Sequence, residues 1–239
     1  MIAFLTSSTA LPDTDLLNPA NHFIEELRNC FPSSCRCLFI CSDPWHSQAT
    51  DHFAYNVKTS FEGEDFSFES FEILDGRNEE EAEQLVENSN LIILAGGHVP
   101  TQNAFFQKIH LKDLLKDYDG ILIGISAGSM NCAKTVYAQP EETGEAVDPS
   151  YEKFIEGLGI TETMILPHYQ SVKDDLLDGM RLFEDITYGD SYGHVFYAIP
   201  DGTYLYIEED KEELRGEAYR IKDGKMEIFC KENETVRMR

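Results

Sequence analysis

Short apolar runs alternate with amphipathic stretches over the first 135 residues of the chain. The apolar, strand-like runs lie at 1–7, 37–42, 68–74, 90–94 and 120–124, and helical patterns lie between them at 20–31, about 45–61, 79–87 and 101–115. Continuous apolar runs of this length between amphipathic helices are typical of a parallel sheet that is covered on both faces. Right-handed crossovers between such strands predict a three-layer, doubly wound, mostly parallel α/β sheet.

The pattern changes after a polar loop at 141–149. A short strand (162–166) and a helix (172–186) are followed by strand-like stretches at 194–199, 203–207, 218–222 and 225–230. Asp201-Gly202 and Asp223-Gly224 are tight-turn signals, so they predict antiparallel hairpins. We expect this hairpin region, about 194–232, to belong to one α/β domain spanning 1–239, because single cores stop growing at roughly 250–300 residues.

Charge and hydropathy narrow the classes of partner. The chain has 19 Lys+Arg against 44 Asp+Glu, a formal net charge of −25. An acidic surface repels phosphate backbones and anionic membranes, so neither nucleic acid nor a membrane is expected as a partner. No apolar run approaches the ~20 residues of a membrane span, and the N-terminal segment lacks the basic region of a signal peptide. A cytoplasmic location is the expectation, and the oligomeric state is left open.

Four of the six cysteines lie between Cys30 and Cys41, where their spacing falls inside a predicted buried strand. No histidine pair lies nearby at zinc-finger spacing. Free thiols in a reducing compartment are the favoured reading, with a metal or disulfide site as the alternative.

The sharpest chemical signal is Gly124-Ile125-Ser126-Ala127-Gly128, which joins an apolar strand to a helical stretch. A nucleophile on a sharp strand-to-helix turn has a strained backbone and needs small neighbours. Amides at the start of the following helix would face a developing oxyanion. A simple small-residue turn that packs a helix against the sheet is the alternative.

A serine nucleophile needs a base, and the base needs an orienting carboxylate. His168 follows a strand, and ligand sites in open α/β sheets lie at the carboxyl edge; His98 is its main rival. Asp201 also follows an apolar strand, with Asp190 and Asp148 as competitors. The order serine–histidine–acid differs from that of α/β-hydrolases, so the motif does not indicate an esterase of that fold.

Gly96-Gly97 ends another strand just before a helix. We expect the Gly97 amide to join that of Ala127 as a two-donor oxyanion hole. A plain strand-to-helix turn is the alternative. The glycines do not form a dinucleotide fingerprint, and no Walker lysine follows them.

Four segments together resemble the dipeptidase E and cyanophycinase family of serine peptidases, whose fold is like that of class I glutamine amidotransferases. They are Ala95-Gly96-Gly97, Gly124-Ile125-Ser126-Ala127-Gly128, Pro167-His168-Tyr169 and Ile199-Pro200-Asp201-Gly202. The resemblance implies that Ser126 is the nucleophile, His168 the base and Asp201 the acid of a small-peptide hydrolase that requires no metal or organic cofactor.

Two departures from the family concern the acid and the substrate. Its dipeptidases often carry Glu where this chain has Asp201, and the Asn-Thr that commonly follows the glycines is replaced by a segment with His98 and Gln102. We therefore expect His98 and Gln102 to line the side of the active site by which the substrate enters.

The best-known dipeptidases of the family prefer an N-terminal aspartate, which requires a cation in the pocket. Lys173 and Arg181 are the candidate cations here, and solvated helix charges are the alternative reading. A hydrolase of other small amides or esters, or an amidotransferase-like binding domain without activity, also fits the sequence.

Overall fold

The computed structural model describes residues 1–12 and 14–238 of the chain. Over these residues the main sheet has eight strands in the order β16-β13-β12-β1-β5-β4-β2-β3. These strands are β1 (Ile2–Thr6), β2 (Cys35–Ile40), β3 (Phe68–Leu74), β4 (Leu91–Leu94), β5 (Ile121–Ile125), β12 (Tyr204–Glu208), β13 (Lys211–Arg215) and β16 (Thr235–Arg237). The five strands from β1 to β3 are parallel, and β12, β13 and β16 extend the sheet in antiparallel fashion.

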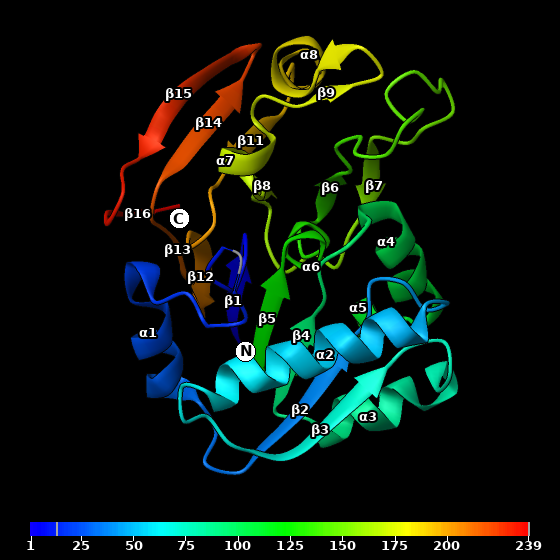
Figure 1. Ribbon diagram of the computed structural model, residues 1–239, viewed down its shortest axis with the longest axis vertical. Helices are drawn as coiled ribbons and strands as arrows, with labels where there is room; N and C mark the ends of the chain where they lie inside the picture. Colours follow the sequence, from blue (N-terminus) through cyan, green and yellow to red (C-terminus); the bar gives the residue numbers. More distant parts are fainter. Residues whose placement is uncertain (13, 239) are drawn as a thin grey trace.

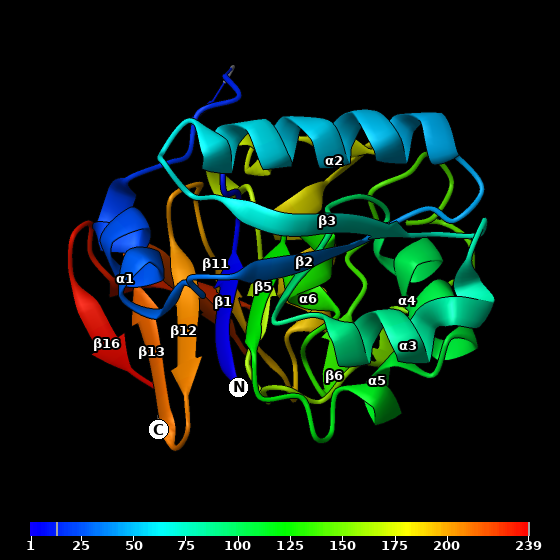
Figure 2. The same ribbon diagram turned by 90° about the horizontal axis from the view of Figure 1, so that it is seen from below.

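Helices cover both faces of the parallel strands, with α2 on one face and α3 on the other (Figure 2). The helical segments that accompany this half are η1 (Ala20–His22), α1 (Phe23–Cys30), α2 (Ser47–Glu62), η2 (Glu79–Glu81), α3 (Ala82–Asn88), α4 (Val99–Lys108) and α5 (Leu111–Leu114). Alternate side chains of β1 serve the two faces: Phe4 packs with residues of α1 and α2, whereas Leu5 packs with residues of α3 and α4. The predicted three-layer α/β fold is thus confirmed.

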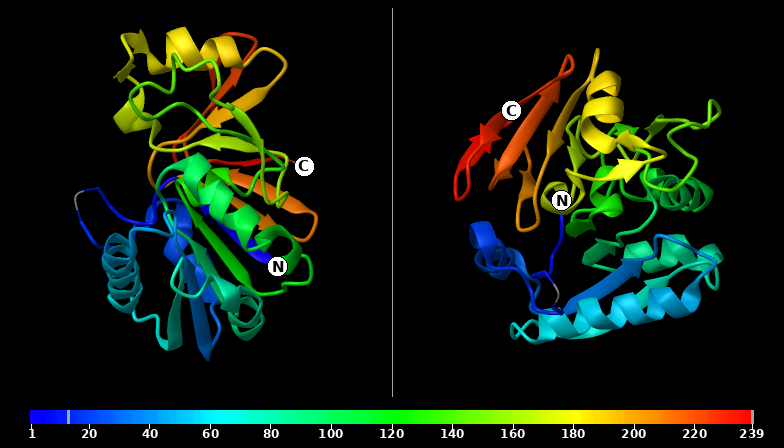
Figure 3. Two further views of the ribbon diagram at one scale, coloured as in Figure 1. Left: turned by 90° about the vertical axis from the view of Figure 1, so that its right-hand side faces the viewer. Right: turned by 45° about the horizontal axis from the view of Figure 1, so that its top comes forward.

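A second sheet has four strands in the order β15-β14-β11-β8. They are β8 (Met164–Leu166), β11 (Val195–Ala198), β14 (Ala218–Lys222) and β15 (Lys225–Cys230). The two sheets occupy different parts of the molecule (Figures 1 and 3). β8 and β11 are parallel, so the residues that follow them, His168 and Asp201, emerge at the same end of this sheet.

Short elements make up the rest of the chain between β5 and β11. They are α6 (Ala127–Met130), β6 (Thr135–Tyr137), β7 (Phe154–Glu156), α7 (Tyr169–Val172), β9 (Leu176–Leu177), β10 (Met180–Arg181), the π-helix η3 (Leu182–Thr187) and α8 (Tyr188–Asp190). β6 pairs with β7, and β9 pairs with β10. None of the described helices is both long and apolar enough to cross a membrane.

Two predictions about the second half of the chain are wrong. Asp201-Gly202 does not close a hairpin, because β11 and β12 on either side of it belong to different sheets. The single helix predicted over 172–186 is interrupted by the β9–β10 hairpin. Asp178 and Gly179 have φ values of 53° and 82°, and two consecutive positive φ angles belong to a type I′ hairpin turn, not to a helix. The Asp223-Gly224 turn between β14 and β15 is confirmed.

Candidate active site

Ser126 lies on the turn between β5 and α6, with φ 50° and ψ −112°. This is an unfavourable conformation for a residue with a side chain, and surrounding contacts must hold it. The Ser126 amide donates to the carbonyl of Thr6 over 3.1 Å. A Cβ on Gly128 would collide with the carbonyl oxygen of Leu94, so the sharp turn requires glycine there. The local sequence therefore builds the strained elbow that the motif predicts, with the Ser126 hydroxyl at its tip.

His168 follows β8 of the second sheet. Its imidazole contacts Ser126, which follows β5 of the main sheet. Its Nε2 lies 2.9 Å from Oγ of Ser126, and its Nδ1 lies 2.8 Å from Oδ1 of Asp201. A carboxylate can only accept, so Nδ1 carries the proton and the lone pair of Nε2 faces the serine hydroxyl. This is the tautomer that a general base for Ser126 needs.

Asp201 follows β11, and hydrogen bonds to several neighbours hold it in place. Its Oδ2 accepts from Nε2 of Gln170 over 2.6 Å, and its backbone N–H donates to Oε1 of Gln170 over 3.0 Å. Burial by itself would raise the pKa of Asp201. The hydrogen bonds from His168 and Ser7, the charge of His168 and the Gln170 amide outweigh burial and hold this pKa below its ordinary value. Asp201 is therefore ionised at neutral pH and can stabilise an imidazolium.

Ser7 is a further member of this network that the sequence did not reveal. It is fully buried (0% exposed) and directly follows β1. Its hydroxyl donates to Oδ1 of Asp201 over 2.7 Å and accepts from the backbone N–H of His168 over 2.8 Å. One side chain thus ties the loop carrying the base to the carboxylate that orients it. Its position after a parallel strand is the signal that could have found it.

The amides predicted to form an oxyanion hole lie beside Ser126. Gly97 has φ 153°, and a Cβ there would collide with Oγ of Ser42, so this position requires glycine. Within the described part of the chain, the Gly97 and Ala127 amides donate to no acceptor. Both are therefore free to donate to a substrate oxygen.

Two cavities meet at Ser126, and Gly97 and His168 line both of them. The first, of about 320 Å³, is also lined by Val99, Met130, Gln139, Pro140, Glu141, Pro167, Val172, Asp175, Leu176, Leu177 and Leu182. The second, of about 310 Å³, is also lined by Ser8, Thr9, Ala10, Asp15, Phe53, Asn56, Val57, Ser60, Gly96 and Ile125. Both volumes lie at the small end of the range for ligand pockets, roughly 300–1,000 Å³. The site suits a short substrate with one portion on each side of the serine.

The residues predicted to bind substrate lie elsewhere. Gln102 is fully buried (0% exposed), where its Nε2 donates to the carbonyl of Ala95 over 2.7 Å. Lys173 is exposed, and Arg181 is exposed and paired with both carboxylate oxygens of Asp185. None of the three lines either cavity, so the structure does not bring them to the site around Ser126. Both cations are solvent-exposed charges, as the alternative reading expects, although Arg181 lies in β10 and not in a helix.

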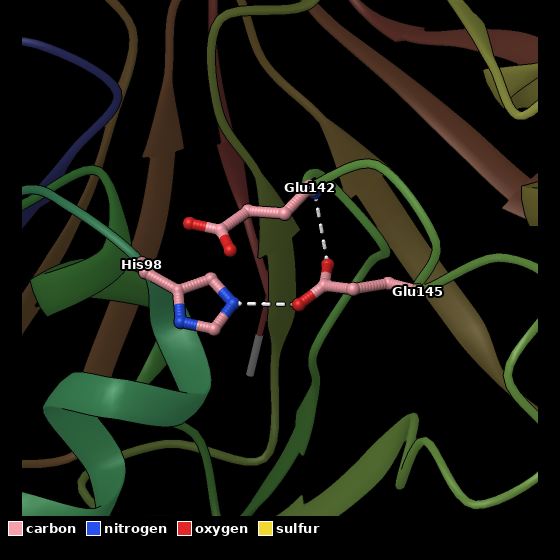
Figure 4. A group of neighbouring side chains, drawn as sticks. All are labelled: His98, Glu142 and Glu145. Carbon is pink, nitrogen blue, oxygen red and sulfur yellow. Dashed lines mark hydrogen bonds and ion pairs between the residues drawn. The ribbon is translucent and has the colours of Figure 1, made fainter.

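His98 does not line either cavity, contrary to expectation, and instead clamps the loop that does (Figure 4). Its Nδ1 lies 2.7 Å from Oγ1 of Thr101, and its Nε2 lies 2.8 Å from Oε1 of Glu145. The other oxygen of Glu145 accepts the backbone N–H groups of Glu141 and Glu142 over 2.9 and 3.0 Å. This chain of contacts fixes the backbone of Glu141, which is one of the residues that line the first cavity.

The same cluster contains the one group of potential metal ligands found among the described residues. Donor atoms of His98, Glu142 and Glu145 lie within 4.8 Å of one another. Both ring nitrogens of His98 and both oxygens of Glu145 already have protein partners. Hydrogen bonding alone accounts for the arrangement.

The rival acids have other roles. Asp190 accepts from the hydroxyl of Tyr137 and pairs with Lys153, and Asp148 caps its own turn by accepting from Ser150. Neither approaches His168, so of the three candidate acids only Asp201 contacts the imidazole.

An elbow serine, a histidine and a carboxylate at the carboxyl edge of an α/β sheet define the class of serine hydrolases. The chain matches peptidase family S51 over residues 3–215. It therefore belongs to this family, a family of serine peptidases of the dipeptidase E kind, and the chain is a peptide hydrolase by membership.

Solved structures agree on the fold. A peptidase from an acI-B1 actinobacterium superposes with a TM-score of 0.63 at 16% identity, covering 99% of this chain and 96% of its own. A peptidase E candidate protein from Listeria monocytogenes EGD-e gives a TM-score of 0.61 at 15% identity, covering 100% and 98%. No curated protein sequence matches the chain.

Proposed function

We propose that the protein hydrolyses short peptides through Ser126, His168 and Asp201 by way of an acyl-enzyme. The observation that carries this proposal is the unbroken line of contacts from Asp201 through His168 to Ser126, at 2.8 and 2.9 Å, opening between two small cavities. Membership of family S51 supports the same reaction.

The reaction follows from the positions of these groups. Oγ of Ser126 attacks the peptide carbonyl carbon while Nε2 of His168 takes the hydroxyl proton. The amides of Gly97 and Ala127 bind the oxyanion. Collapse of the tetrahedral intermediate breaks the C–N bond, and His168 gives its proton to the leaving amine. Water then attacks the ester with His168 again as base, which releases the acid and restores Ser126.

Glu141 supports a peptidase that acts at a free amino terminus. Its Oε1 accepts the backbone N–H of Val99 over 3.2 Å, and within the described residues its Oε2 has no partner. Glu141 is exposed to solvent and lines the first cavity, and its carboxyl contacts the backbone of Val99, another lining residue. Burial there raises the pKa, an effect that Val99 and His98 only partly offset. A substrate ammonium group would supply the counter-charge that this carboxylate lacks.

The decisive experiment compares two histidines that each contact an aspartate. His168→Ala and Ser126→Ala are expected to lower the hydrolysis of short peptides by about 10⁴-fold or more, with an unchanged fold by circular dichroism. His46, whose Nδ1 lies 2.6 Å from Oδ2 of Asp43 on the surface, provides the control. His46→Ala is expected to keep full activity. Retained hydrolysis in folded Ser126→Ala contradicts the proposal.

The requirement for a free amino terminus is tested separately. The wild-type protein is expected to hydrolyse a free dipeptide faster than its N-acetylated form, and Glu141→Gln is expected to narrow that difference by raising KM for the free form. Equal rates on both forms in the wild type would exclude the exopeptidase assignment and leave the serine chemistry untouched.

Six free thiols among the described residues support the predicted cytoplasmic location.

A further inference from the structure

The first cavity has a largely apolar wall. The side chains that form this wall are those of Val99, Met130, Val172, Leu176, Leu177 and Leu182. Three of them are buried members of one core cluster and two more pack against that cluster, so the apolar wall continues a hydrophobic core of the protein. An apolar substrate group entering here would leave water for a surface of the same kind.

Leu176 stands at the mouth of this cavity. It is 70% exposed, although it lies in the β9–β10 hairpin that forms part of the wall. Leu177 and Leu182 also line this cavity, and we refer to Leu176, Leu177 and Leu182 together as the apolar strip. A substrate side chain resting on this strip would cover apolar surface that is otherwise in water, which favours binding.

The charges around the cavity have one sign. Besides His168, its ionisable lining residues are Glu141 and Asp175, and no Lys or Arg is among its described lining residues. The whole chain carries a net charge of −25. A carboxylate on the substrate would meet repulsion in this cavity and would lose its hydration without a counter-ion.

We infer that the first cavity selects peptides whose first residue has an uncharged, apolar side chain, with leucine or methionine as the best examples, and rejects those that begin with aspartate. This inference rests on the proposed function and names its substrate class. Glu141 would bind the terminal ammonium group, and the strip of Leu176, Leu177 and Leu182 would bind the side chain. Of these three leucines, Leu176 is the best position at which to introduce a charge, because it is exposed and its substitution would not disturb the core.

The test uses Leu-Ala, Asn-Ala and Asp-Ala, because leucine, asparagine and aspartate share branching at Cγ and differ in polarity and charge. For the wild-type protein, kcat/KM is expected to fall in that order, with Leu-Ala at least about tenfold above Asp-Ala. Leu176→Arg is expected to reduce this ratio by about tenfold. Ile228→Arg changes an equally exposed apolar residue (64% exposed) of β15, outside both cavities, and is expected to leave the ratio unchanged.

Two results overturn the inference. One is turnover of Asp-Ala equal to or faster than that of Leu-Ala by the wild-type protein, and the other is a ratio that Leu176→Arg and Ile228→Arg change alike. A protein that reacts with a fluorophosphonate at Ser126 but hydrolyses none of the three peptides also overturns it. Failure to react at Ser126 instead overturns the proposed function, so the two failures are distinguishable.

Discussion

Replacing Ser7 by alanine removes one hydroxyl that serves two members of the site. The loss deprives Oδ1 of Asp201 of a donor at 2.7 Å and leaves the backbone N–H of His168 without its acceptor at 2.8 Å. Because Ser7 is fully buried, water cannot easily replace the hydroxyl. The variant therefore perturbs the orientation of the base while every group that touches substrate is kept.

Two effects determine the size of the expected loss of stability. A hydrogen bond to a charged group contributes about 1.5–3 kcal/mol, and an orphaned buried donor costs about 1–3 kcal/mol. Because the two are neighbours and not additive, we expect the free energy of unfolding to fall by about 2–4 kcal/mol. A displaced imidazole is expected to slow acylation of Ser126 by about 10- to 100-fold.

Ser191 offers a matched control. It is also fully buried, donates to the carbonyl of Tyr188 over 2.8 Å and accepts the backbone N–H of Gly224 over 2.9 Å. Urea unfolding and the rate of fluorophosphonate labelling are measured for Ser7→Ala, Ser191→Ala and the wild type. Both variants should lose stability, but only Ser7→Ala should label slowly. Equal labelling rates in the two variants would refute the positioning role of Ser7.

Three other variants test separate parts of the site. Asp201→Asn keeps the shape of the carboxylate but not its charge, and is expected to lower kcat by about 10⁴-fold, measured on the best short peptide; a loss below tenfold would argue against Asp201 as the orienting acid. Gly97→Ala, which drives a methyl group into Ser42, is expected to lower kcat by about 10²–10³-fold through the displaced amide, and an unchanged kcat would remove Gly97 from the oxyanion hole. The pKa of Glu145 is lowered in the fold, because the Glu141 and Glu142 amides and His98 outweigh burial. Its contribution to stability is therefore complete above its ordinary pKa of 4.5 and is lost as the pH falls through its lower folded value. The difference in unfolding free energy between wild type and Glu145→Gln should accordingly shrink as the pH falls below about 4.5. A difference that does not depend on pH would exclude a contribution of the ionised Glu145 carboxylate to stability.

The parallel half of the fold could be predicted because its strands are short, continuously apolar and separated by amphipathic helices. The ends of the strands were predictable for the same reason. Because Ser126, His168 and Asp201 each follow a strand, the sequence also predicted that they lie close together. β13 escaped prediction because four of its five residues are charged, and β16 because it is only three residues long with a single apolar side chain. Both are antiparallel strands at one edge of the main sheet.

Asp-Gly pairs show the limit of local signals. Asp223-Gly224 closes a hairpin, and Asp178-Gly179 closes one inside a predicted helix. Asp201-Gly202 instead passes the chain from the second sheet to the main one, and only its glycine has a positive φ. Local turn chemistry allows all three outcomes, and long-range strand pairing decides among them.

Side-chain partners were the least predictable part of the site. Ser7 and Gln170 have no motif, and their roles follow only from the approach of β1 to the loops that carry His168 and Asp201. Arg181 resembled a substrate-binding cation in the sequence, but Asp185, four residues later, neutralises it. This pair lies at the start of the π-helix η3.

The most direct test of the central claim is the site of covalent modification by a fluorophosphonate. The protein is treated with one equivalent of the probe, its intact mass is measured, and the modified peptide is sequenced by fragmentation. The account predicts a single adduct on Ser126 that disappears in Ser126→Ala and forms at least about 10²-fold more slowly in His168→Ala. An adduct on another residue, or none on a folded protein, would contradict it.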